Sequence, residues 1–121
     1  MTRDWLLSYF AAADTLVPDQ LLEYFANDAS FQMGNMPVRQ GYQEIHQGLL
    51  LFYSRLSSMR HEELATLTEA RMGMMEASAH YHLRDGRVLV LPVVTVLRTN
   101  QSQKVISARI YMDPSPINTA A

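Results

Sequence analysis

The chain contains no cysteine, which excludes disulfides, thiolate metal ligands and a cysteine nucleophile. It also lacks an apolar run of the roughly 18 residues that a membrane-spanning helix needs. Twelve acidic residues against ten basic ones leave a formal net charge of −2, and Lys104 is the one lysine. So small a charge would not hold nucleic acid or an anionic membrane. The N-terminal segment is interrupted by Asp4 and does not resemble a signal peptide, so we expect a cytoplasmic protein.

The 121 residues suit a single domain, 1–121, in which we expect 114–121 to be a flexible tail. Hydrophobic residues make up 48% and charged residues 18%, as in a globular protein with a real core. Eight residues are methionine. Methionine is flexible and polarizable, so this excess fits either ordinary core packing or an adaptable apolar cavity.

The first half of the chain shows helical periodicity in three places. Apolar residues recur at helical spacing from Trp5 to Ala13, with Asp4 as a possible cap, and Pro18 suits the first turn of a second helix. A third helix is predicted after Gly41 because apolar residues follow there at spacings of three and four. Two short strands are expected between the second and third helices, at 29–33 and 38–40.

The second half shows the composition of strands, at 61–68, 72–84, 88–98 and 104–113. Asp85-Gly86 is a strong hairpin signal between two of them. Pro92 cannot donate to a strand ladder, so we expect a bulge or irregular pairing there. Helices followed by an antiparallel meander favour an α+β fold with the helices on one face of the sheet.

Two segments, LLEYFANDASFQMGNMPVRQGYQEIHQGLLLFYSRL and HLRDGRVLVLPVVTVLR with KVISARIYMD, resemble the SnoaL-like polyketide-cyclase family. That family belongs to the superfamily of nuclear transport factor two, ketosteroid isomerase and limonene-epoxide hydrolase. The resemblance implies a cone, in which a curved antiparallel sheet of four long strands plus short strands wraps around three N-terminal helices. It also implies an apolar pocket, no cofactor or metal, and a homodimer through the outer face of the sheet.

The resemblance to ketosteroid isomerase assigns three positions. Tyr9 falls where that family places its oxyanion-hole tyrosine, although a core tyrosine is an equal alternative. Met33 falls where the family has its general-base aspartate, so allylic isomerisation by the family mechanism is not expected. Thr95 stands where the second, acidic donor would be.

Alternation along 72–84 puts Met75, Ala77, Ala79, Tyr81 and Leu83 on one face and Glu76, Ser78, His80, His82 and Arg84 on the other. By pattern alone the polar set faces water. The resemblance suggests the reverse, so we expect His80 and His82 to point into the cone as catalytic acid–base groups beside Tyr9. No third ligand has a suitable spacing, so a metal role is not expected. His46 and His61 are interpreted as solvated or rim histidines.

The family's strand parity also selects candidate substrate-binding residues. Arg39 and Asn35 lie near the expected pocket mouth, where Arg39 could bind a carboxylate, polarise a carbonyl or form a surface salt bridge. The whole expected set is Met33, Asn35, Arg39, Phe52, Met74, Leu91, Val93, Thr95, Ile110 and Met112. Met72 and Met74 are expected to face the pocket, and Met75 the opposite side.

Three functions fit these features. The first is a cofactor-independent cyclase or isomerase of secondary metabolism, acting on a hydrophobic polyketide- or terpenoid-like substrate. The second is epoxide hydrolysis, which needs an Asp/Arg/Asp set. The residues expected on one face of the strands do not supply such a set. The third is a non-catalytic ligand-binding or dimeric interaction module, which the missing family carboxylates favour.

Overall fold

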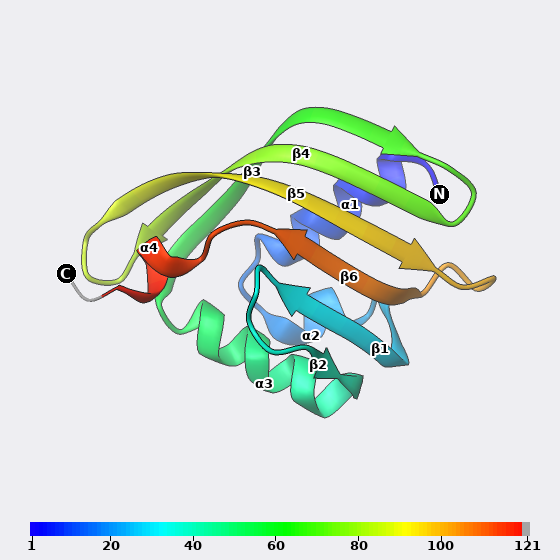
Figure 1. The fold of residues 1–121 in the computed structure, drawn as a ribbon, viewed down its shortest axis with the longest axis horizontal. Coiled ribbons are helices and arrows are strands. Elements are labelled where there is room, and N and C mark those ends of the chain that lie inside the picture. The colour runs from blue at the N-terminus through cyan, green and yellow to red at the C-terminus, as the bar shows by residue number, and fades with distance from the viewer. Residues whose placement is uncertain (120–121) are drawn as a thin grey trace.

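Three helices lie against one face of a curved sheet whose opposite face is open (Figure 1). The computed structural model describes residues 1–119. The helices are α1 (Arg3–Ala13), α2 (Pro18–Leu22), α3 (Gly41–Tyr53) and the short α4 (Ser115–Asn118). The strands are β1 (Phe25–Met33), β2 (Arg39–Gln40), β3 (Leu56–Thr68), β4 (Met72–Leu83), β5 (Val88–Thr99) and β6 (Val105–Tyr111). This confirms the predicted α+β cone.

Local sequence signals explain where the helices begin. The Thr2 side chain caps α1 by accepting the N–H of Trp5 at 3.1 Å, so the cap is Thr2 and Asp4 lies in the first turn. Pro18 opens α2 as expected. At the start of α3, the Glu44 carboxylate accepts the backbone N–H of Gln40 at 3.0 Å, which satisfies a donor that the helix itself cannot.

The sheet has the strand order β2-β1-β6-β5-β4-β3. All neighbours are antiparallel except β1 and β6, which run parallel; this one parallel pair was not predicted. The expected irregularity at Pro92 is absent, because Pro92 pairs in register with Ser78. β6 pairs with β5 only from Val94 onward, so the missing N–H of Pro92 interrupts no ladder on that side. The register shifts of β3 lie instead at 56–58 and 63–65.

The face of the sheet that packs against α1, α2 and α3 is here called the inner face. On β4 it carries the buried apolar set Met75, Ala77, Ala79, Tyr81 and Leu83. The expected orientation of β4 was therefore wrong, and Met72 and Met74 lie on the outer face while Met75 is buried. Burying the five apolar side chains against the helices is favourable. Burying the opposite set would remove two histidines and a glutamate from water, which costs free energy unless each finds a hydrogen-bond partner.

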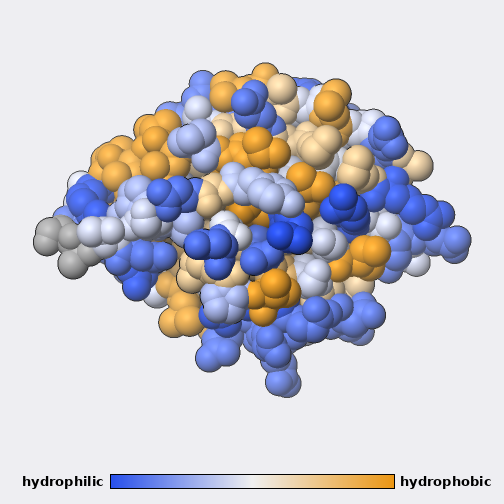
Figure 2. All heavy atoms as spheres, in the orientation of Figure 1, coloured by the Kyte–Doolittle hydropathy of each residue, from blue (hydrophilic) through white to orange (hydrophobic). Residues whose placement is uncertain are grey.

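The outer face of the sheet is rich in apolar side chains, which Figure 2 shows over its upper strands. Val88 and Val90 on β5 are 58% and 52% exposed, and Leu67 on β3 is 70% exposed. In the last part of the chain, Ser115–Asn118 forms α4 with Ile117 buried, and Arg87 holds this segment by donating to the carbonyls of Pro116 and Thr119. This part of the expected tail is thus packed on the domain; positions 120–121 lie outside the described residues.

Candidate active site

A small cavity lies between the helices and the inner face of the sheet. Its volume is about 40 Å³, enough for water but not for a drug-sized molecule. Five of the predicted site residues line it: Tyr9, Met33, Phe52, Thr95 and Ile110. The rest of the wall is apolar or aromatic apart from His61 and Tyr53. The sequence therefore located the cavity correctly, although it did not identify every polar group in it.

The most distinctive polar feature of the cavity is an Asp14–His61 pair. Asp14 is the C-cap of α1 and His61 lies on β3. The Asp14 Oδ1 is 2.7 Å from the His61 Nδ1, and Asp14 Oδ2 accepts the His61 backbone N–H at 3.0 Å. Both side chains are largely buried, at 10% exposure for His61 and 22% for Asp14. The last turn of α1 and the middle of β3 thus meet through a carboxylate and an imidazole.

This contact fixes the tautomer of His61. A carboxylate accepts hydrogen bonds, so a neutral His61 carries its proton on Nδ1 and presents a lone pair on Nε2. The Phe10 ring packs against the imidazole with 4.7 Å between ring centroids. Within residues 1–119, Nε2 has no protein partner, and His61 lines the cavity. The pair therefore presents an oriented proton acceptor to an apolar space.

Two buried tyrosines, Tyr9 and Tyr53, border the same cavity. Burial raises the pKa of Tyr9 well above its usual range, and nearby Tyr53 adds to the rise. Burial likewise raises the pKa of Tyr53, with a further contribution from the negative charge of Asp14. Neither hydroxyl has a hydrogen-bond partner in the described chain. Every completely shielded side-chain oxygen in that part of the chain does have a partner, so the two tyrosine hydroxyls are not completely shielded and must border the open volume of the cavity. Both phenols therefore remain protonated and can act as donors.

A larger hollow opens outward from the cavity, and we call it the vestibule. Its volume is about 330 Å³, within the range of small-molecule sites. The vestibule shares four wall residues with the cavity: Phe31, Met33, Leu49 and Phe52. It is further lined by Arg39, which was predicted at the pocket mouth, and by Arg55, which was not. A molecule seated in the vestibule would meet the cavity across this shared apolar neck.

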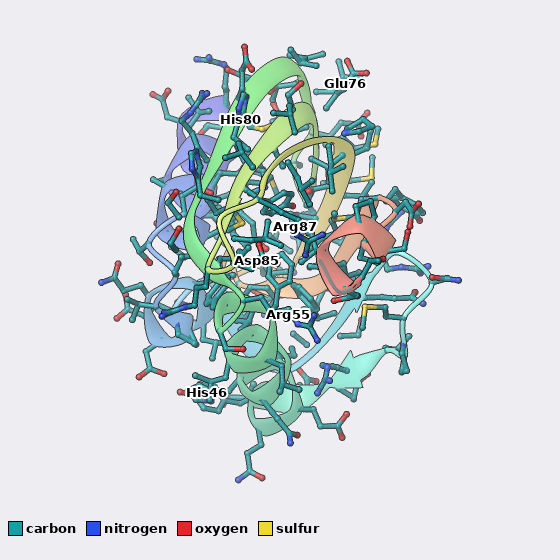
Figure 3. The ribbon with its side chains drawn as sticks, turned by 90° about the vertical axis from the view of Figure 1, so that its left-hand side faces the viewer. His46, Arg55, Glu76, His80, Asp85 and Arg87 are labelled. Carbon is teal, nitrogen blue, oxygen red and sulfur yellow. The ribbon has the colours of Figure 1, made fainter. Side chains whose placement is uncertain are left out.

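The structure places His80 and His82 away from the cavity. Both side chains project from the outer face of β4, where His82 is exposed and His80 Nε2 lies 2.9 Å from Glu62 Oε1. Figure 3 shows His80 high on β4, far from His46 on α3. Their expected orientation was wrong for the reason given above: the apolar alternate set of β4 occupies the inner face.

The remaining predicted residues are divided between three places. Leu91 and Val93 lie on the inner face of β5, on the same side as Thr95, without lining the cavity. Asn35 and Met112 line a shallow surface hollow with Gly34, Tyr111 and Asp113. Met74 pairs with Val96 on the outer face, which corrects its assignment to the pocket.

Four functional candidates were missed: Asp14, Tyr53, His61 and Arg55. The interpretation of His61 as a solvated or rim histidine was wrong, because its side chain is only 10% exposed and lines the cavity. A usable signal existed for two of the four candidates. Asp14 directly follows the last buried residue of α1, a position from which a side chain reaches the next layer. His61 is two residues from the buried Met59, so strand parity places both on the inner face. Residues 1–119 contain no cluster of three His, Cys, Asp or Glu able to hold a metal ion.

Comparisons with solved structures reproduce this architecture. A Catenulispora acidiphila protein described as having a ketosteroid isomerase-like fold, in complex with trimethylamine, matches with a TM-score of 0.84 at 17% identity over 100% of both chains. A suggested SnoaL-like polyketide cyclase from Shewanella denitrificans gives 0.81 at 16% identity, covering 96% of this chain and 93% of the other. Another from Jannaschia gives 0.80 at 13%, covering 97% and 88%. Identities this low show the fold alone.

The sequence itself carries the family signal. No curated protein matches the chain. No helix in the described residues is long and apolar enough to cross a membrane. The family model of the SnoaL-like domain matches residues 6–107, most of the chain, including both members of the Asp14–His61 pair. The chain belongs to the SnoaL-like domain family.

Proposed function

We propose that this protein is a small-molecule enzyme that moves protons by acid–base catalysis in its apolar cavity, as a cyclase or isomerase does. The Asp14–His61 pair carries the proposal, because a carboxylate orients an imidazole whose free nitrogen faces a cavity. This relocates the proton-transfer role from the outer face of β4 to β3. Tyr9 keeps the role that the sequence suggested, and Tyr53 joins it.

The proposed reaction begins at a carbon next to a carbonyl group. His61 Nε2 takes a proton from that carbon, and the electron pair of the C–H bond moves to the carbonyl oxygen to give an enolate. Tyr9 and Tyr53 donate hydrogen bonds to this oxyanion, and their raised pKa values keep them protonated as donors. Asp14 stabilises the imidazolium that forms.

Two outcomes complete the reaction. In an isomerisation, the imidazolium returns its proton to another carbon of the enolate system. In a cyclisation, the enolate carbon attacks a second carbonyl of the same molecule, and the imidazolium protonates the resulting alkoxide. Both outcomes restore neutral His61 and consume no cofactor. The apolar wall suits a hydrophobic polyketide- or terpenoid-like substrate of secondary metabolism, and we place the enzyme in the cytoplasm.

Epoxide hydrolysis on the same fold is less well supported. It would need an Asp/Arg/Asp set, and the inner cavity has no arginine in its wall across the residues described. A purely ligand-binding module remains the main rival, and it differs from the enzyme in one measurable respect. A binding module would hold a ketone without exchanging its protons.

The test is α-proton exchange in D₂O, followed by NMR with a panel of aromatic and alicyclic ketones. We expect the protein to incorporate deuterium next to the carbonyl of at least one ketone, and His61→Ala to remove this activity. Ketones that bind without any enzyme-dependent exchange would instead support the binding module. His46→Ala is the matched control, because His46 lies on α3 outside the cavity wall.

We also propose a homodimer formed through the outer face of the sheet. The exposed apolar side chains on β5 support it, since Val88 and Val90 are more than half exposed on adjacent outward positions. A partner on this face would remove them from water. The inner cavity belongs to one chain in this arrangement, so the proposed chemistry does not depend on the dimer.

A further inference from the structure

The vestibule differs from the cavity in its charge. We infer that it binds an anionic group of the substrate, a carboxylate, through Arg39 and Arg55. The inference rests on the proposed function only in placing the chemistry at His61; binding at the vestibule can be measured without turnover. It narrows the substrate to an apolar carbonyl compound that also carries a carboxylate.

The vestibule wall holds two positive charges and no negative one. Arg39 and Arg55 line it together with apolar residues, Ser54 and Asn118. The ion pairs within residues 1–119 use other cations, so neither guanidinium is neutralised by a carboxylate there. Asp85 follows Arg84, whose backbone N–H donates to the Arg55 carbonyl at 2.9 Å, but the Asp85 carboxylate is already paired with Arg87 at 2.9 Å. Two guanidinium groups beside an apolar wall favour an anion with an apolar body.

Arg39 is held in position by its neighbours. Its Nη1 donates to the carbonyl of Glu44 at 3.3 Å. Its side chain crosses Gly48 so closely that a Cβ on Gly48 would collide with the Arg39 Cδ and Nε. Glycine inside a helix is destabilising relative to alanine. Because Gly48 has no side chain, the Arg39 side chain can pass over the helix at this point and lie in the vestibule wall.

The dimensions of the site suit such a substrate. The cavity, at about 40 Å³, can take only a small reacting end, whereas the vestibule, at about 330 Å³, can hold the body of a small molecule. Met33 and Phe52 border both spaces, and methionine can adjust its shape as the ligand passes. If the arginines bind the carboxylate at one end of the substrate, the other end, which carries the carbonyl group, would be directed toward His61. A carboxylate is also less costly to desolvate beside apolar side chains than a dianionic phosphate.

The experiment compares two probes of equal shape, 2-naphthoate and neutral 2-naphthamide, by isothermal titration calorimetry. We expect the protein to bind 2-naphthoate about tenfold or more tightly than 2-naphthamide, as charge-assisted hydrogen bonds predict. Arg39→Gln and Arg55→Gln should each reduce this preference severalfold and leave 2-naphthamide binding unchanged. Gly48→Ala should act like Arg39→Gln, because the new methyl group displaces Arg39 while alanine favours the helix.

Arg60→Gln is the control, since Arg60 is an exposed arginine on the outer side of β3, paired opposite His80. His61→Ala should keep the preference for 2-naphthoate even though it removes exchange activity, which separates this inference from the proposed function. Equal binding of the two probes, or binding of neither, would overturn the site. So would a preference that survives Arg39→Gln, Arg55→Gln or Gly48→Ala in variants shown by circular dichroism to be folded.

Discussion

Asp14 holds His61 at two points, the ring Nδ1 at 2.7 Å and the backbone N–H at 3.0 Å. The two residues lie 47 positions apart in the sequence, so the contact ties the end of α1 to the third strand of the chain. The backbone contact fixes the position of β3 and the ring contact fixes the direction of the imidazole. One carboxylate thus has a structural and a positioning role.

The first prediction concerns this carboxylate. Asp14→Asn should lower the exchange rate about 10²-fold or more, because an amide cannot stabilise the imidazolium and also permits the wrong tautomer. His61→Ala should cost about 10²–10⁴-fold. Asp14→Glu should recover part of the loss, which a purely structural contact would not show. The rates are measured by deuterium incorporation, and an Asp14→Asn protein as active as the unchanged one would contradict the assignment.

The second prediction concerns the hydroxyls in the cavity. Tyr9→Phe and Tyr53→Phe should each slow exchange about 10²-fold, the usual effect of losing one oxyanion donor. Ketone binding should change little, because the ring and its packing remain. Tyr81→Phe is the matched control: the Tyr81 hydroxyl meets only the Met112 sulfur, at 3.8 Å, in the described chain. A Tyr81→Phe loss as large as the other two would argue for a general packing effect.

The third prediction follows from the raised pKa values of Tyr9, Tyr53 and Tyr81, all caused mainly by burial. An unfolded tyrosine loses its proton near its ordinary pKa of 10.0, whereas these three stay protonated in the folded protein to higher pH. Above about pH 10 the unfolded state therefore releases more protons, and stability falls as the pH rises. Urea unfolding between pH 8 and pH 11 measures this. Tyr9→Phe should make the decline shallower, and an equal slope would contradict the prediction.

The sequence was sufficient for the fold because the apolar periods of the helices and strands are long and regular. The family resemblance placed Tyr9, Met33, Phe52, Thr95 and Ile110 at the cavity, and all five line it in the structure. The sequence-based prediction was wrong for β4. Either of the two alternating sets of side chains on this strand could have faced inward, and the family resemblance favoured the polar set. Burial of five apolar side chains decides that strand, and the helices that bury them are distant in sequence.

Parity with Met59 indicates the face that His61 occupies, but the contact between Asp14 and His61 could not be predicted from the local pattern of either segment. His61 lies between two register shifts of β3, at 56–58 and 63–65, so counting alternation along the whole strand gives the wrong face for part of it. Asp14 looks like an ordinary residue at the end of a helix. Their meeting depends on how α1 crosses β3, which is a property of packing rather than of either segment.

The fourth prediction compares two glycines with positive φ. Gly34 has φ +55°, and a Cβ there would lie 2.7 Å from the backbone oxygen of Met112. Gly86 has φ +95° but open space around it. Gly34→Ala should therefore destabilise the protein by about 2–4 kcal/mol, combining backbone strain with a clash that only main-chain movement can relieve. Gly86→Ala should cost only about 1–2 kcal/mol, from strain alone. Equal losses in chemical denaturation would contradict this account.

The last prediction tests the proposed homodimer. Val90 is 52% exposed on the outer face and pairs with His80, which itself contacts Glu62. A glutamate at position 90 would place a second carboxylate beside His80, which already contacts Glu62. Burying an unpaired charge in an interface costs several kcal/mol. Val90→Glu should thus convert the dimer to monomer in sedimentation velocity without changing the circular dichroism spectrum. Val17→Glu, at a residue 42% exposed beside α2, should leave the dimer intact. If Val90→Glu remains dimeric, the outer face is not the interface. If the unchanged protein is already monomeric at about 100 μM, well above the Kd of a stable dimer, there is no dimer to assign.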